Sequence, residues 1–165
     1  MTATGPLERL QSLLAATVDD PGLASIEGRP IALGWATVEL DRAAVEFGAA
    51  LDLPAARFVE VDPTPTLGAR CRIARGVLPT GMTLVLLEPN TEGRLAASLA
   101  RHGEGPSAVW LAVGDLPAAL AGLRSAGLAT SVEGPGPLGA ERLLLDRPVH
   151  GPHRLVVERP GTIRA

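Results

Sequence analysis

The chain contains one pattern of segments twice. Residues 32–47, ALGWATVELDRAAVEF, match residues 108–123, AVWLAVGDLPAALAGL, at a constant offset. Each copy opens with an apolar, strand-like run, continues with an acidic residue and a leucine, and then becomes an alanine-rich helical segment. A self-match of this kind indicates an internal repeat, which governs every later fold prediction. We therefore predict a fold made of two similar halves.

Short apolar runs separated by turn residues follow each predicted helix, three after each. The closing runs match as well, since LVLLEP at 84–89 parallels RLVVER at 154–159. Both copies thus have the order strand, helix and three strands, which is a βαβββ module. Modules of this kind bury one sheet face against other layers, which predicts the α+β class. The predicted runs are 57–61, 69–75 and 82–88, then 128–133, 141–146 and 153–158.

Acidic residues mark the starts of the two repeated helices. Glu39 and Asp115 directly precede the first helical leucine of each copy, and Pro117 stands early in the second helix, where its missing N–H costs little. The first helix is expected to end near Asp52. The second is expected to stop at Gly127, because glycine suits a helix C-terminus.

Two more helices are expected outside the repeat. Apolar residues spaced at three and four between positions 7 and 18 predict an amphipathic helix and not a signal peptide. A second one, at 92–101, connects the halves, with Gly103 able to close it. The predicted organisation is a helical extension at 1–29, a first βαβββ module at 30–90, a linker helix at 91–105, a second module at 106–160 and a tail at 161–165.

Composition excludes several classes of function. The net charge is −3 and only 2% of the residues are aromatic, so the chain lacks the basic surface and the stacking platforms that nucleic acid requires. No run reaches the roughly 18 apolar residues of a membrane span. The single cysteine, Cys71, cannot form an intramolecular disulfide and is interpreted as a buried, inert thiol. A cytoplasmic protein without nucleic-acid or membrane partners is predicted.

The repeated order of elements resembles the vicinal oxygen chelate superfamily, which includes glyoxalase-like, bleomycin-resistance-like and methylmalonyl-CoA epimerase-like proteins. The stretch LVLLEPNTEGRLAASLARHGEGPSAVWLAVGDLPAALAGLRSAG is the part most similar to the epimerases, and the likeness covers roughly residues 30–159. The resemblance implies two modules that form a curved, eight-stranded mixed sheet around a cavity. In metal-dependent members, His and Glu or Gln side chains on the first and last strand of each module hold a divalent ion.

Apolar residues occupy the positions that correspond to those ligands. The first-strand positions fall at Ala32 and Ala108, and the last-strand positions at Val85 and at Leu155, or at Val157 if a gap of two residues is allowed. Hydrocarbon side chains have no lone pair to give to a metal. We therefore predict no metal and no other cofactor. Glu88 and Glu158 are interpreted as exposed carboxylates at strand ends.

Strand alternation nominates a few side chains for the cavity. Thr83, Trp110 and His153 share its predicted face, although Trp110 also suits a core and His153 also suits a partly exposed strand start. Arg70 and Arg72 could bind a carboxylate or phosphate, or could simply be solvated. His153, with His150 and Asp146 nearby, superficially resembles a metal cluster, but the Gly-Pro turn within it argues against that. GPGPLG at 134–139 is interpreted as a hairpin connection.

These features predict a protein that binds a small, largely apolar ligand in the cavity between its modules without a metal. Whether any catalysis remains is left open, because a metal-dependent lyase or epimerase of the glyoxalase type is the alternative. A third possibility is a dimeric partner-binding module with a vestigial cavity. A homodimer is expected, since exposed sheet edges favour self-association.

Overall fold

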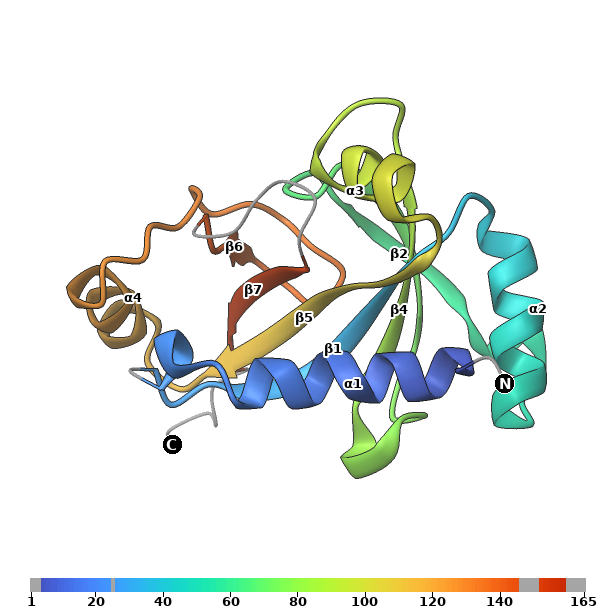
Figure 1. Ribbon diagram of the computed structural model, residues 1–165, viewed down its shortest axis with the longest axis horizontal. Helices are drawn as coiled ribbons and strands as arrows, with labels where there is room; N and C mark the ends of the chain where they lie inside the picture. The colour runs from blue at the N-terminus through green and yellow to red at the C-terminus, as the bar shows by residue number, and fades with distance from the viewer. Residues whose placement is uncertain (1–3, 25, 146–151, 160–165) are drawn as a thin grey trace, which may run out of the picture.

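A computed structural model describes residues 4–24, 26–145 and 152–159, which form one mixed sheet flanked by helices (Figure 1). The sheet order is β2-β3-β4-β1-β5-β7-β6. The helices are α1 (Pro6–Val18), α2 (Leu40–Leu51), α3 (Arg94–His102) and α4 (Leu116–Ser125), with short 3-10 turns η1 (Pro21–Leu23), η2 (Ala55–Arg57) and η3 (Pro79–Gly81). The strands are β1 (Arg29–Ala36), β2 (Val59–Thr64), β3 (Ala69–Ala74), β4 (Thr83–Pro89), β5 (Gly105–Val113), β6 (Glu141–Leu143) and β7 (His153–Glu158).

The centre of the sheet is an antiparallel pair formed by β1 and β5. On one side β1 runs parallel to β4, and on the other side β5 runs parallel to β7. The result is a curved, half-barrel sheet, so the predicted α+β class is confirmed. The duplication and the module boundaries at 30–90 and 106–160 stay predictions.

The predicted count of eight strands is wrong, because the described residues form seven. The segment 128–133 makes only an isolated antiparallel bridge, between Thr130 and Leu144. Pro135 and Pro137 follow closely and have no N–H to extend a ladder. The predicted strand 141–146 is also shorter, ending at Leu143, and its last residue lies outside the described part of the chain.

The two faces of the sheet bury different clusters. One, here called the helix face, packs against α1, α2 and α4 and includes Leu33 and Trp35 of β1. The other, here called the inner face, includes Ala32 and Ala36 of the same strand, and α3 contributes Leu95 to it. In Figure 1, α1 crosses in front of the central strands, while α2 and α4 lie near opposite ends of the molecule. This alternation fixes which residues can reach a site on either face.

Two carboxylates from distant segments hold the start of α2. The Leu40 N–H donates to Glu88 Oε2 at 3.0 Å, and the Val38 N–H donates to Glu104 Oε1 at 2.8 Å. Glu104 also accepts from the Thr37 hydroxyl at 2.7 Å. Negative charge is favourable at a helix N-terminus, where backbone N–H groups lack partners. Glu88 is therefore a capping residue with a side chain 28% exposed, and its interpretation as an exposed strand-end carboxylate is wrong.

The described helices include none with both the length and the hydropathy needed to cross a bilayer. The α1 helix has 13 residues, and one side of it is pressed onto the sheet through Leu10. Its apolar residues are thus already used in packing, as the amphipathic spacing of this segment predicts.

Replacing Gly34 with alanine is expected to destabilise the fold by about 1–3 kcal/mol. A Cβ at position 34 would lie 2.9 Å from Trp110 Cζ3 and 3.1 Å from Ala108 Cβ, both in the packed inner face. Chemical denaturation of Gly34→Ala would measure the loss. Gly114→Ala is the matched control, because a Cβ there meets nothing within 4 Å. Equal stability of the two variants would contradict this packing.

Candidate functional site

The four positions predicted to correspond to metal ligands lie on the inner face. Ala32, Val85, Ala108 and Leu155 all belong to the inner cluster, and each is 0% exposed. Only methyl and methylene groups point inward from these positions, so the residues present do not fit a divalent ion. Among the described residues, no group of three or more His, Cys, Asp or Glu side chains is arranged to hold a metal.

The side chain of Trp110 fills the centre of this face. Its Cζ3 atom lies against Gly34 on one side, where no Cβ stands in the way. At the other end of the indole, Nε1 donates to Glu141 Oε1 at 3.1 Å. Trp110 is 0% exposed, so in this structure it acts as a core residue. The indole therefore occupies space that an open cavity would require.

Glu141 is a buried carboxyl that was not among the residues predicted from the sequence. It is 1% exposed, and besides Trp110 it accepts a hydrogen bond from the Thr64 hydroxyl at 2.6 Å. Burial raises the pKa of the Glu141 carboxyl, and the hydrogen bonds from Thr64 and Trp110 partly oppose this. It lies two residues from Leu143 of the inner face, but β6 has only three residues, so its sequence pattern is too short to have placed Glu141.

The 134–139 loop closes directly over that carboxyl. Gly134 and Glu141 exchange two backbone hydrogen bonds, so this segment is the hairpin connection predicted from its sequence. A Cβ on Gly136 would lie 1.8 Å from Glu141 Oε1, which shows how closely the loop approaches. On the same face Cys71 is fully buried, and burial raises the pKa of its thiol to about 12, as expected of an inert cysteine.

His153 is a further buried titratable group of the inner face. It is 3% exposed, which corrects its interpretation as a partly exposed strand-start residue. Its Nε2 atom has no hydrogen-bond partner among the residues that the structure describes. Burial, followed by the charge of Arg94, lowers the pKa of the imidazole to about 4. The predicted neighbours His150 and Asp146 lie outside the described residues.

The remaining cavity candidates are divided between the two faces. Thr83 is 8% exposed and pairs in register with Ala32, in agreement with its predicted place. Arg70 and Arg72 lie on the opposite face, because they alternate with the buried Cys71. Arg70 contacts Glu60 and Glu88, and Arg72 Nη1 lies 2.6 Å from Asp41 Oδ1. The structure therefore does not bring these two arginines to the inner face.

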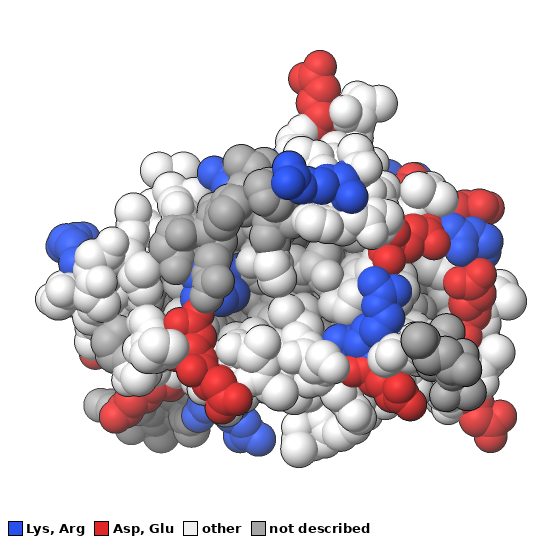
Figure 2. Space-filling view, in the orientation of Figure 1, with Lys and Arg blue, Asp and Glu red and all other residues white. Residues whose placement is uncertain are grey.

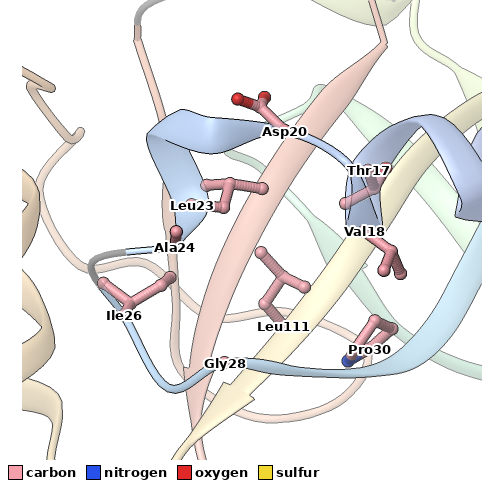
Figure 3. A pocket seen from close by; sticks show the side chains of 9 residues that line it. All are labelled: Thr17, Val18, Asp20, Leu23, Ala24, Ile26, Gly28, Pro30 and Leu111. Atoms are coloured by element: carbon pink, nitrogen blue, oxygen red, sulfur yellow. The ribbon is translucent and has the colours of Figure 1, made fainter.

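Two of the hollows on the helix face lie beside α1. The smaller, of about 260 Å³, lies between the end of α1 and β5 and has Asp20 in its wall (Figure 3). Asp20 forms an ion pair with Arg154. The larger, of about 560 Å³, lies under the first half of α1 and has no charged residue in its lining. Figure 2 shows charges of both signs in small groups on this side, with no continuous basic area.

Comparison with solved structures identifies the fold. The chain is similar to methylmalonyl-CoA epimerase from Mycobacterium tuberculosis, with a TM-score of 0.68 and 20% identity over 84% of this chain and 91% of that one. It is also similar to the Streptomyces coelicolor methylmalonyl-CoA epimerase in complex with 2-nitronate-propionyl-CoA (TM-score 0.66, 22% identity, 81% and 98% covered). A hypothetical protein from Bacillus halodurans is similar with a TM-score of 0.66 and 17% identity, over 84% of this chain and 99% of that one.

These likenesses show that the chain shares the fold of the methylmalonyl-CoA epimerases, which confirms at the level of the fold the resemblance predicted from the sequence. No family model and no curated protein matches the sequence itself. At about 20% identity, the likeness establishes the fold and leaves the activity to be argued from the residues.

We expect the free energy of unfolding of the wild type to fall as pH rises, because Glu141 ionises. The variant Glu141→Gln should lack this fall. Because the folded-state pKa of Glu141 is raised, its contribution is fully present below the unfolded pKa and is lost as pH rises through the folded pKa. Glutamine keeps an acceptor for Trp110 but carries no charge. Urea denaturation from pH 4 to 8 tests this, with the exposed Glu92→Gln as control. Parallel pH profiles for Glu141→Gln and the wild type would contradict it.

His153→Leu is expected to reduce the fall in the free energy of unfolding that the wild type shows as pH decreases towards 4. The folded pKa of about 4 lies below the ordinary 6.5, so stability is present above the unfolded pKa and is lost as pH falls. Between pH 7 and pH 4 the wild type should lose about 3 kcal/mol through this group. Replacement of His102, which lies on α3, supplies the control. An unchanged acid limb in His153→Leu would show that the imidazole does not titrate as inferred.

Proposed function

We propose that this protein binds a small, largely apolar molecule without a metal and does not catalyse a reaction. The observation that carries the proposal is the hydrocarbon lining at Ala32, Val85, Ala108 and Leu155, with Trp110 packed in their midst. In the vicinal oxygen chelate fold a metal polarises substrate oxygens, and that chemistry needs lone pairs at these positions.

The acid and base groups of the inner face also argue against proton transfer. A general base must reach the proton that it removes, directly or through one water. Both Glu141 oxygens are engaged, one by Trp110 and one by Thr64, and the loop at 134–139 covers them. His153 is buried with its Nε2 atom enclosed. Neither residue is placed to meet a substrate from solvent.

A coenzyme A thioester, the kind of ligand named for the similar epimerases, finds little support in this chain. Arg70 and Arg72 were the arginines considered for a phosphate or carboxylate. Both form ion pairs with carboxylates on the helix face, away from the inner face. The net charge of −3 gives no general attraction for such an anion either.

Metal analysis is the direct test. Protein expressed with added Co²⁺ and Mn²⁺ and then desalted should retain well under about 0.1 ion per chain, and neither ion should raise the melting temperature, since a ligand selective for the native state would do so. A methylmalonyl-CoA epimerase treated in parallel supplies the positive control. Retention of one ion per chain, with a matching rise in melting temperature, would overturn the proposal and favour the metal-dependent alternative.

A further inference from the structure

The larger hollow of the helix face is an apolar pocket of about 560 Å³, here called the α1 pocket. Its size falls in the range of about 300 to 1,000 Å³ that is typical of small-molecule sites. Three elements form its walls: the first half of α1, the end of α2 and the turn that leads into β4. The lining residues are Leu7, Leu10, Gln11, Leu14, Leu33, Leu51, Val77, Leu78, Pro79 and Met82.

Firm packing holds the walls in place around this space. Leu10 and Leu33 are 1% and 2% exposed, so they anchor the floor of the pocket in the helix-face core. Leu7 and Leu14, one turn to either side on α1, are only partly buried and face the opening. The far wall is a turn closed by two backbone hydrogen bonds. The Leu78 N–H donates to the Met82 carbonyl at 3.0 Å, and the Gly81 N–H donates to the Leu78 carbonyl at 3.1 Å. The pocket is therefore built into the fold.

The lining chemistry defines the occupant. Gln11 is the one polar side chain among the lining residues, and it stands exposed at the rim. A charged group taken into such an apolar space without a partner costs far more free energy than a hydrogen-bonded neutral one. An apolar body fits the walls, and a neutral hydroxyl, amide or ester oxygen fits the Gln11 amide, which both donates and accepts.

We propose that the α1 pocket binds a neutral, apolar molecule on the order of 20 non-hydrogen atoms, with its polar end at Gln11. This inference rests on the proposed binding function and moves the site from the filled inner face to the helix face. The hollow at the end of α1 is less suited to the same ligand, because its volume is only about 260 Å³ and the acidic residue Asp20 is among its lining residues (Figure 3).

Two fluorescent probes with the same ring system test the ligand class. N-phenyl-1-naphthylamine is neutral, whereas 1-anilinonaphthalene-8-sulfonate carries a negative charge. We expect the neutral probe to bind at least tenfold more tightly, with enhanced and blue-shifted emission. Gln11→Arg should reverse part of this preference by tightening the sulfonate probe severalfold, since it places a cation at the rim. Gln11 is exposed on a helix, so this variant should leave folding intact.

A matched pair of valine variants tests the location. Val77→Phe adds volume inside the pocket and should weaken the neutral probe at least tenfold. Val132→Phe makes the same change at a side chain that is 84% exposed and outside the pocket, and it should have no effect. Thermal unfolding of both variants establishes that they are folded before affinities are compared.

The remaining outcomes separate this inference from the proposed function. The α1 pocket is overturned as the site if the affinity for the neutral probe is unchanged in both Val77→Phe and Gln11→Arg. It is also overturned if the neutral probe does not bind. A dimer that Val77→Phe converts to a monomer would show that a second copy covers this surface, which also overturns the inference. The proposed function is judged separately, by the metal analysis.

Discussion

The contact between Trp110 and Gly34 determines what the inner face can do. A glycine in the central strand leaves room for an indole, and the indole then spans from β1 towards Glu141 on β6. The Trp110 N–H is satisfied by the carboxyl, so a large aromatic side chain can be buried without an unpaired polar group. Around it stand alanine, valine and leucine side chains. The inner face is in this way a second hydrophobic core.

This arrangement also changes the role of the helix face. In a curved sheet with both faces covered, stability and binding compete for the same apolar surface. Here the inner face is fully packed, while α1 leaves a gap between its partly buried leucines and the turn at Val77. An apolar gap of this volume remains a stable feature only where rigid neighbours support it. The sheet core beneath α1 supplies that support.

Much of the fold could be predicted because repeated patterning reports on buried faces. Ala32 and Leu155 lie on one face, as the alternation of β1 and β7 predicts, and the acidic-Leu steps mark the starts of α2 and α4. The correspondence of Ala32 and Leu155 to metal ligands stays a prediction. The carboxyl at Glu141 was missed because a three-residue strand gives too short a pattern to show which way it faces. Arg70 and Arg72 were considered for the cavity, although alternation with a buried Cys71 already directs them to the opposite face of the sheet. Tertiary ion pairs such as Arg72 with Asp41 have no local sequence signal.

The clamp at the start of α2 bears on how chains of this kind are recognised. Glu88 belongs to the LLEP stretch and Glu104 to the GEG turn, and these are the stretches that most resemble the epimerases. In this molecule both carboxylates accept hydrogen bonds from backbone N–H groups at the start of α2. The features that make the sequence look like an enzyme are therefore architectural. In another chain, the LLEP and GEG stretches would therefore indicate this helix clamp, and evidence for an active site would have to come from other positions.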